Sequence, residues 1–157
     1  MNRRWDFASL PLRLVLGIAF AYHGYPKLFD AATRSNFTGM LGGIGIPAPG
    51  FMSWVVGLLE FFGGLALIVG AFIVVISILG VIEMLVAMFT VHWSHGFNFI
   101  NMTMTPEGPS FGLPGIEVNL LYIAGFLALA LAGAGALSVD RMLFGRRAAV
   151  EATSPSR

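Results

Sequence analysis

The sequence contains no cysteine and little charge. Without cysteine among its 157 residues, the chain itself carries no disulfide, thiolate zinc site, iron–sulfur cluster or thiol redox motif. Charged residues make up 11% of the chain, against about 25% in soluble domains. The formal net charge of +1 supplies no basic patch for nucleic acid. A soluble domain and a nucleic-acid partner are therefore excluded, and any redox role has to use a group or partner from outside the chain.

Long hydrophobic runs dominate the rest of the sequence. Hydrophobic residues make up 57% of the chain, and no lysine or arginine occurs between Arg34 and Arg141. A transmembrane helix needs about 20 apolar residues to cross about 30 Å of hydrocarbon. Four segments meet this condition, at about residues 10–29, 51–69, 72–93 and 117–137. We therefore predict an all-α integral membrane protein: a four-helix transmembrane bundle in one domain over residues 1–145, followed by a disordered tail at residues 146–157.

The two ends of the chain carry most of the positive charge. The end of the first span and the loop after it hold only Lys27 and Arg34. The ends hold Arg3, Arg4, Arg13, Arg141, Arg146, Arg147 and Arg157. Lysine and arginine are enriched on the cytoplasmic side of membrane proteins, so both termini are predicted to be cytoplasmic. Segments 30–50 and 94–116 then lie on the outer side, and a tight turn at Gly70-Ala71 lies on the inner side.

Small residues mark the faces on which the helices pack. Helices in lipid associate through close packing of small residues. Spacings of three and four place one set of residues on a single face of the first span: Arg13, Gly17, Phe20, Gly24 and Lys27. A second set lies on or near one face of the second span: Gly57, Glu60, Gly63 and Gly64. We expect the glycines of both sets to serve close helix packing.

Two carboxyl groups, Glu60 and Glu83, lie near the middle of the second and third predicted spans. A charge at the bilayer centre costs at least about 2.5–3.5 kcal/mol, so such residues need partners and are candidates for function. Lys27 is the only obligate cation within reach, because the arginines lie toward the cytoplasmic end. Two arrangements remain open. Either one glutamate pairs with Lys27 while the other stays protonated, or a histidine or bound cation supplies the second charge. The carboxyl groups then either relay protons or only fix the helix register.

The predicted topology gathers polar side chains from all four spans in the outer half of the bundle. We predict Lys27, Glu60 and Glu83 as catalytic residues. The candidates for binding a quinone or other substrate are His23, Lys27, His92, His95, Glu117 and Asn119. No metal or haem is predicted, because Glu83 lies on the opposite helical face from the pair His92-x-x-His95.

Short motifs follow one another in a fixed order along the predicted spans. They are Arg13-x-x-x-Gly17-x-x-Phe20-x-x-x-Gly24-x-x-Lys27-Leu28-Phe29, Ile46-Pro47-x-Pro49, Gly57-x-x-Glu60-x-x-Gly63-Gly64, His92-Trp93-x-x-Gly96-Phe97 and Glu117-x-Asn119-x-x-Tyr122. Together they resemble the DoxX family over about residues 10–143. The resemblance implies a small four-helix, multi-pass protein of the bacterial plasma (inner) membrane. Members of the family are commonly described as oxidoreductases, and the related DoxD family supplies the membrane subunit of a thiosulfate:quinone oxidoreductase.

Two hypotheses of function follow. In the first, the chain is the membrane subunit of a quinone-linked oxidoreductase or oxidative-stress redox complex. Lys27 and His23 donate hydrogen bonds to a quinone, Glu60 or Glu83 relays protons, and electrons come from a reduced substrate or a partner redox protein.

In the second hypothesis the protein is not an enzyme. It is a small permease or proton path, which four helices form only as a homo-oligomer, or a membrane scaffold for a partner protein. The lipid bilayer is a partner in both hypotheses, and quinone is the one cofactor that the residues suggest.

Overall fold

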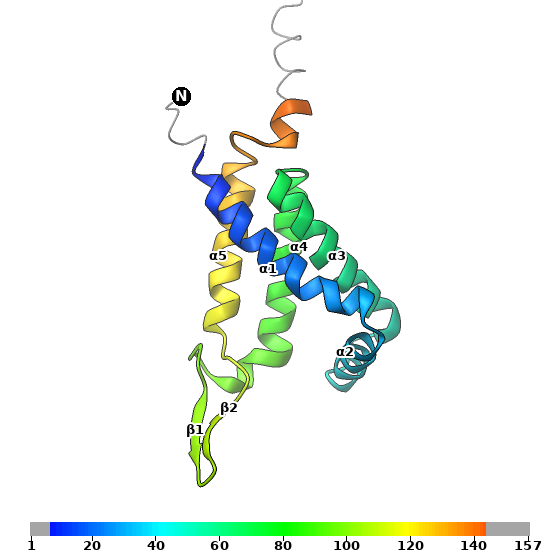
Figure 1. Cartoon of the computed structure of the whole chain (residues 1–157), viewed down its shortest axis with the longest axis vertical. Coiled ribbons are helices and arrows are strands. Elements are labelled where there is room, and N and C mark those ends of the chain that lie inside the picture. The colour runs from blue at the N-terminus through cyan, green and yellow to red at the C-terminus, as the bar shows by residue number, and fades with distance from the viewer. Residues whose placement is uncertain (1–6, 144–157) are drawn as a thin grey trace, which may run out of the picture.

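A computed structural model describes residues 7–143 and shows a mainly helical chain (Figure 1). Its helices are α1 (Ser9–Phe29), α2 (Ala31–Gly43), α3 (Pro49–Val69), α4 (Ile73–Ala87) and α5 (Glu117–Ala132). After α4, the chain continues through a π-helical turn at Met88–His92 and a 3-10 turn at Trp93–His95. A short antiparallel hairpin follows, formed by β1 (Met102–Thr105) and β2 (Gly108–Phe111).

Three of the predicted spans agree closely with helical segments. α1 and α3 cover the first two, and the helical run Ile73–His95 covers the third. α5 begins where predicted but ends at Ala132, because Gly133 adopts a positive φ of 73°. The run Ile73–His95 and α3 are long and apolar enough to cross a membrane, while α5 is a shorter apolar helix. The tail predicted at residues 146–157 lies outside the described residues.

The segment 30–50, predicted as a loop from the sequence, contains helix α2. The carboxylate of Asp30 caps the start of this helix by accepting hydrogen bonds from the backbone N–H groups of Ala32 and Thr33. A further hydrogen bond, from the Thr33 hydroxyl, holds the pKa of Asp30 below its ordinary value. Hydropathy alone missed α2 because the helix buries little apolar surface: Leu41 is its one buried residue.

The long helices pack in two antiparallel pairs, α1 with α3 and α4 with α5 (Figure 1). The pairs meet near the end where the N-terminal part of α1 lies, and they diverge toward the other end. An apolar cluster lies where they meet, formed by Leu16, Phe20, Leu67, Ile73, Phe126 and Leu129. Within it the ring of Phe20 packs edge-on against Phe126, with 4.8 Å between ring centroids.

Glycines bring the backbones of α1 and α3 into direct contact. A Cβ added to Gly24 would lie 2.3 Å from the backbone nitrogen of Phe61, and one added to Gly64 would lie 2.4 Å from that of Ala21. Neither distance is sterically possible, so these positions accept only glycine unless the helices move apart. The predicted packing role of these glycines is confirmed.

Arg13 joins the two helix pairs at the end where they meet. The side chain is 1% exposed. It donates five hydrogen bonds of 2.7–3.2 Å to carbonyl oxygens that follow the end of α5 or lie in the last turn of α3: Leu67, Ile68, Ala134, Ala136 and Leu137. A cation at helix C-termini complements the partial negative charge of the unpaired carbonyls. The sequence places Arg13 on the packing face of the first span and among the terminal positive charges, but it does not reveal these carbonyl partners.

The turn between α3 and α4 is short, as predicted, and lies at the end of the molecule where Arg13 joins the helix pairs. Gly70 adopts a positive φ of 77° and ends α3. The carboxylate of Asp140 accepts hydrogen bonds from the N–H groups of Phe72 at 2.8 Å and Ile73 at 3.0 Å, which caps the start of α4. The chain segment after α5 therefore closes this end of the bundle.

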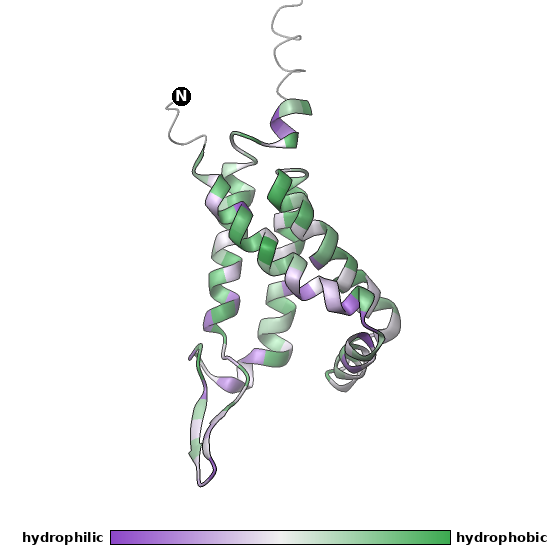
Figure 2. Ribbon diagram, in the orientation of Figure 1, coloured by the Kyte–Doolittle hydropathy of each residue, from purple (hydrophilic) through white to green (hydrophobic). Residues whose placement is uncertain are grey.

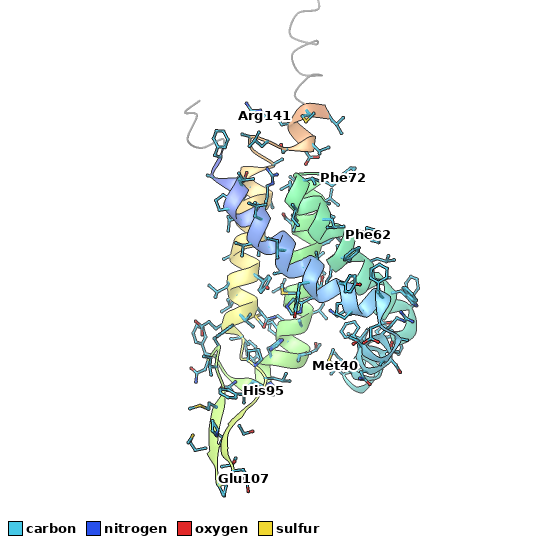
Figure 3. The ribbon with its side chains drawn as sticks, in the orientation of Figure 1. Met40, Phe62, Phe72, His95, Glu107 and Arg141 are labelled. Atoms are coloured by element: carbon cyan, nitrogen blue, oxygen red, sulfur yellow. The ribbon has the colours of Figure 1, made fainter. Side chains whose placement is uncertain are left out.

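The two ends of the molecule differ in construction. Arg141 lies at the end that Arg13 and Asp140 hold together, whereas His95 and Glu107 lie toward the hairpin end (Figure 3). Between them, most of the helical ribbon consists of hydrophobic residues (Figure 2). Exposed apolar side chains on the long helices include Val15, Ile18, Leu58, Phe62, Val75 and Ile78. This distribution is typical of a surface that faces lipid rather than water.

Candidate functional site

A cavity of about 640 Å³ lies where the two helix pairs diverge. All five helices contribute to its wall, together with the loop before α5. Most of the lining is apolar. The acidic, basic or amide side chains in the lining are His23, Lys27, Glu60, Glu83, His92 and Asn119. The structure therefore brings six of the eight predicted site residues to one cavity.

Lys27 and Glu60 form an ion pair at the α1–α3 side of this cavity. The Nζ atom of Lys27 lies 2.6 Å from Oε1 and 2.5 Å from Oε2 of Glu60. The same Nζ atom lies 4.4 Å from the centre of the Phe37 ring in α2. Both charged side chains are largely buried. A largely buried cation is stable only when it is well paired. Here the carboxylate of Glu60 and the face of the Phe37 ring together stabilise the ammonium group of Lys27.

Glu83 completes a group of three ionisable side chains. It projects from α4 and lies within hydrogen-bonding reach of the Glu60 carboxyl and close to Lys27. Its Oε2 atom is buried and has no hydrogen-bond partner among residues 7–143. The structure pairs Lys27 with Glu60, a feature that both arrangements predicted from the sequence share. Glu83 is the second carboxyl, which lies beside that pair.

His92 and Asn119 line the part of the cavity formed by α4 and α5. The Nδ1 atom of His92 lies 2.7 Å from the carbonyl oxygen of Pro114, which fixes the ring. His92 ends the π-helical turn Met88–His92, and π-turns widen a helix locally and often occur at functional sites. Asn119 is 2% exposed and its Nδ2 points to the Met84 carbonyl oxygen at 3.4 Å.

The remaining candidates differ in their surroundings. His23 lines the cavity but is exposed, and its ring packs edge-on against Tyr22. His95 and Glu117 do not line the cavity. The Nδ1 atom of His95 is 3.0 Å from the Val91 carbonyl oxygen, and Glu117 accepts a hydrogen bond from the backbone of Phe99 at 2.9 Å. These last two residues fix the segment that joins the helices to the hairpin.

Part of the apolar lining of the cavity is exposed. The exposed lining residues include Met40, Val55, Leu79, Ile82 and Val86. They come from α2, α3 and α4, so the exposed part of the lining lies on these helices.

Sequence reasoning missed two contributors to the cavity. Phe37 covers Lys27 from α2, a helix that hydropathy did not reveal. Tyr122 lines the cavity from α5 and packs against Phe20 and Phe126. Tyr122 lies one turn after Asn119 at a spacing of three, so helical periodicity could have placed it on the same face.

Comparison with known proteins gives a consistent result. The sequence profile of the DoxX family matches residues 8–93. The "Inner membrane protein YqjF" of Escherichia coli is 31% identical over 145 residues, which cover 91% of this chain and 97% of that protein. The protein named "Putative oxidoreductase CatD" of Bacillus subtilis is 26% identical over 144 residues, with 92% of each chain covered. No solved structure matches.

Proposed function

Since this chain belongs to the DoxX family, a family of membrane proteins, we propose that it is the membrane subunit of a quinone-linked oxidoreductase whose cavity binds the quinone ring. One observation carries the proposal: a mostly apolar cavity of about 640 Å³ contains two neighbouring carboxyl groups and a lysine. Its volume lies within the range of about 300–1,000 Å³ typical of small-molecule sites. The relative named as an oxidoreductase supports the reaction class.

The walls of the cavity fit a lipophilic aromatic ring. Phe20 and Tyr122 supply aromatic surface at the α1 and α5 sides, and methionine and aliphatic side chains supply the rest. The exposed apolar lining on α2, α3 and α4 is where the tail of a membrane quinone would lie. These features favour a ligand that partitions into the bilayer.

The carboxyl groups supply the proton chemistry that a quinone needs. Its reduction to the quinol takes up two electrons and two protons. A partner redox protein supplies the electrons, because this chain has no cysteine for thiol chemistry. Lys27 compensates the charge of Glu60. The Lys27 ammonium passes a proton through the Glu60 carboxylate to a reduced ring oxygen and regains one from the aqueous side for the second transfer, while the Glu83 carboxyl accepts a hydrogen bond from the hydroxyl that forms.

The proposal includes four spans with both termini in the cytoplasm of a bacterial cell. α1 and α5 pack along the two helices that are long and apolar enough to cross a membrane, and their outward faces are apolar as well. Arg13 and Arg141 lie at the end proposed to be cytoplasmic, in line with the bias of positive charge to that side. The hairpin then lies on the outer side.

Quinone binding tests the proposal directly. The full-length protein in lipid nanodiscs is titrated with decylubiquinone by isothermal calorimetry. Ala87 lines the cavity, and Ala87→Phe fills it, so we expect binding to weaken by about tenfold or more, equivalent to about 1.4 kcal/mol. Ala128 is exposed on α5 outside the cavity, and the matched variant Ala128→Phe should bind as the wild type does. Absence of binding to the wild type, or equal loss in both variants, refutes the proposal.

A further inference from the structure

The polar atoms that remain without a partner deep in the cavity are hydrogen-bond acceptors. Among residues 7–143, the side-chain atoms in the cavity lining that are buried and unpartnered are Oε2 of Glu83 and Oδ1 of Asn119. The amide of Asn119 is oriented by its Nδ2, which faces the Met84 carbonyl oxygen, an acceptor. The Oδ1 atom is therefore the free group. A buried acceptor without a donor is costly, so a ligand is expected to supply one.

His92 adds a third acceptor to this set. Its Nδ1 contacts the Pro114 carbonyl oxygen, which can only accept, so Nδ1 carries the hydrogen. In the neutral imidazole the hydrogen on Nδ1 leaves a lone pair on Nε2. The part of the cavity between α4 and α5 thus presents acceptors from Glu83, His92 and Asn119.

The strongest donor of the cavity is already engaged. The ammonium group of Lys27 has three N–H bonds and contacts both oxygens of Glu60 and the face of Phe37. The Glu60 and Glu83 carboxyls lie within hydrogen-bonding reach of each other, and Oε2 of Glu83 is the oxygen that stays without a partner. His23 and Tyr122 can donate, but His23 is exposed and Tyr122 is only half-buried.

From this pattern we infer that the cavity is built for the reduced form of its ligand, an aromatic diol, and binds the quinol more tightly than the quinone. The inference rests on the proposed function and specifies the redox state that the same site selects. Quinone oxygens only accept hydrogen bonds, so a quinone leaves Glu83 and Asn119 unpaired. The hydroxyl groups of a quinol donate to them.

The expected preference has a consequence for electron transfer. Leaving a buried acceptor unpaired is costly enough that we expect the quinol to bind at least about tenfold more tightly. Tenfold tighter binding of the reduced form raises the potential of the bound two-electron couple by about 30 mV. The protein would thereby make its quinone a stronger oxidant toward the partner that delivers electrons.

The test compares the two redox forms on the same protein. Full-length protein in nanodiscs is titrated without oxygen with decylubiquinone and decylubiquinol, and separately with decylhydroquinone and its dimethyl ether, which has the same ring but no O–H donor. We expect the quinol and the hydroquinone to bind at least about tenfold more tightly than their counterparts. Equal or tighter binding of the quinone or ether overturns the inference alone. Binding of none of the four overturns the proposed function and the inference with it.

Two variants test whether the acceptors in the cavity cause the tighter binding of the quinol. Asn119→Leu removes one acceptor and should reduce the quinol preference by about threefold or more, mainly by weakening quinol binding. Ser77→Ala is the matched control, because Ser77 also has a buried unpartnered oxygen but does not line the cavity. Glu83→Gln introduces an N–H donor and should strengthen quinone binding relative to the wild type. A preference unchanged in both Asn119→Leu and Glu83→Gln would contradict the assignment.

Discussion

Replacing Arg13 by methionine removes the cation that joins the helix pairs while keeping a side chain of similar length. Two of its five carbonyl partners keep another donor: Leu67 accepts from the N–H of Gly70, and Ala134 accepts from the hydroxyl of Ser9. The other three have no second partner among the described residues: Ile68, Ala136 and Leu137. At about 1–3 kcal/mol for each unpaired buried carbonyl, the loss is about 3–9 kcal/mol. Water that reaches this end of the molecule places the expected value near the lower limit, at about 4 kcal/mol.

Thermal unfolding of the purified protein in dodecyl maltoside, followed by near-ultraviolet circular dichroism, measures this loss. For a chain of this size, about 4 kcal/mol corresponds to a decrease in Tm of about 8–16 °C. Arg34→Met is the matched control, because Arg34 donates one hydrogen bond to the Leu28 carbonyl and stacks on Trp54. It should lower the Tm by less than about 4 °C. If Arg13→Met unfolds within about 2 °C of the wild type, the five hydrogen bonds do not hold the pairs together and the reasoning fails.

Three further predictions concern packing, topology and pH. Gly24→Ala should destabilise the protein by about 1–3 kcal/mol because its Cβ overlaps the α3 backbone, whereas Gly39→Ala, with open space around it in α2, should be neutral or stabilising in the same thermal assay. Because the chain has no cysteine, single cysteines report topology: Glu107→Cys should react with an impermeant maleimide in intact cells, and Met142→Cys only after permeabilisation. Labelling of both in intact cells would contradict the proposed orientation. The lowered pKa of Asp30 means that its cap on α2 is fully formed above the pKa of the unfolded chain and is lost as pH falls through the lower, folded pKa. Thr33→Val should raise the pKa of Asp30 in a carbon-13 NMR titration. An unchanged pKa would exclude the Thr33 hydroxyl as the cause of the lowering.

The sequence was sufficient for features that depend on periodicity and on the number of charges. Spacings of three and four placed Gly17 and Gly24 on the face of α1 that contacts α3. Because cations are scarce, Lys27 was predicted as the partner of a glutamate, and the ion pair with Glu60 confirms that prediction. Both inferences use only local geometry and a count of charged groups.

Other features depend on contacts between distant segments and could not be read in advance. Spacing places Arg13 on the packing face of α1, but its partners could not be predicted because the carbonyls that bind it come from the end of α3 and the segment after α5. The π-turn that positions His92 has no simple sequence signal. His95 and Glu117 lie outside the cavity lining, because the fold directs His95 to the Val91 carbonyl and Glu117 to the backbone of Phe99.

The hydrogen bonds of Arg13 also determine where one helix pair can rotate relative to the other. The 16 residues of α1 that follow Arg13 span about 24 Å, so this part of the helix is a lever whose pivot lies at Arg13. A rotation of about 7° at this pivot moves the far end of α1 and α3 by about 3 Å relative to α4 and α5. That displacement is comparable to the thickness of one aromatic ring. The width of the cavity can therefore change with its occupant while the hydrogen bonds at the pivot stay intact.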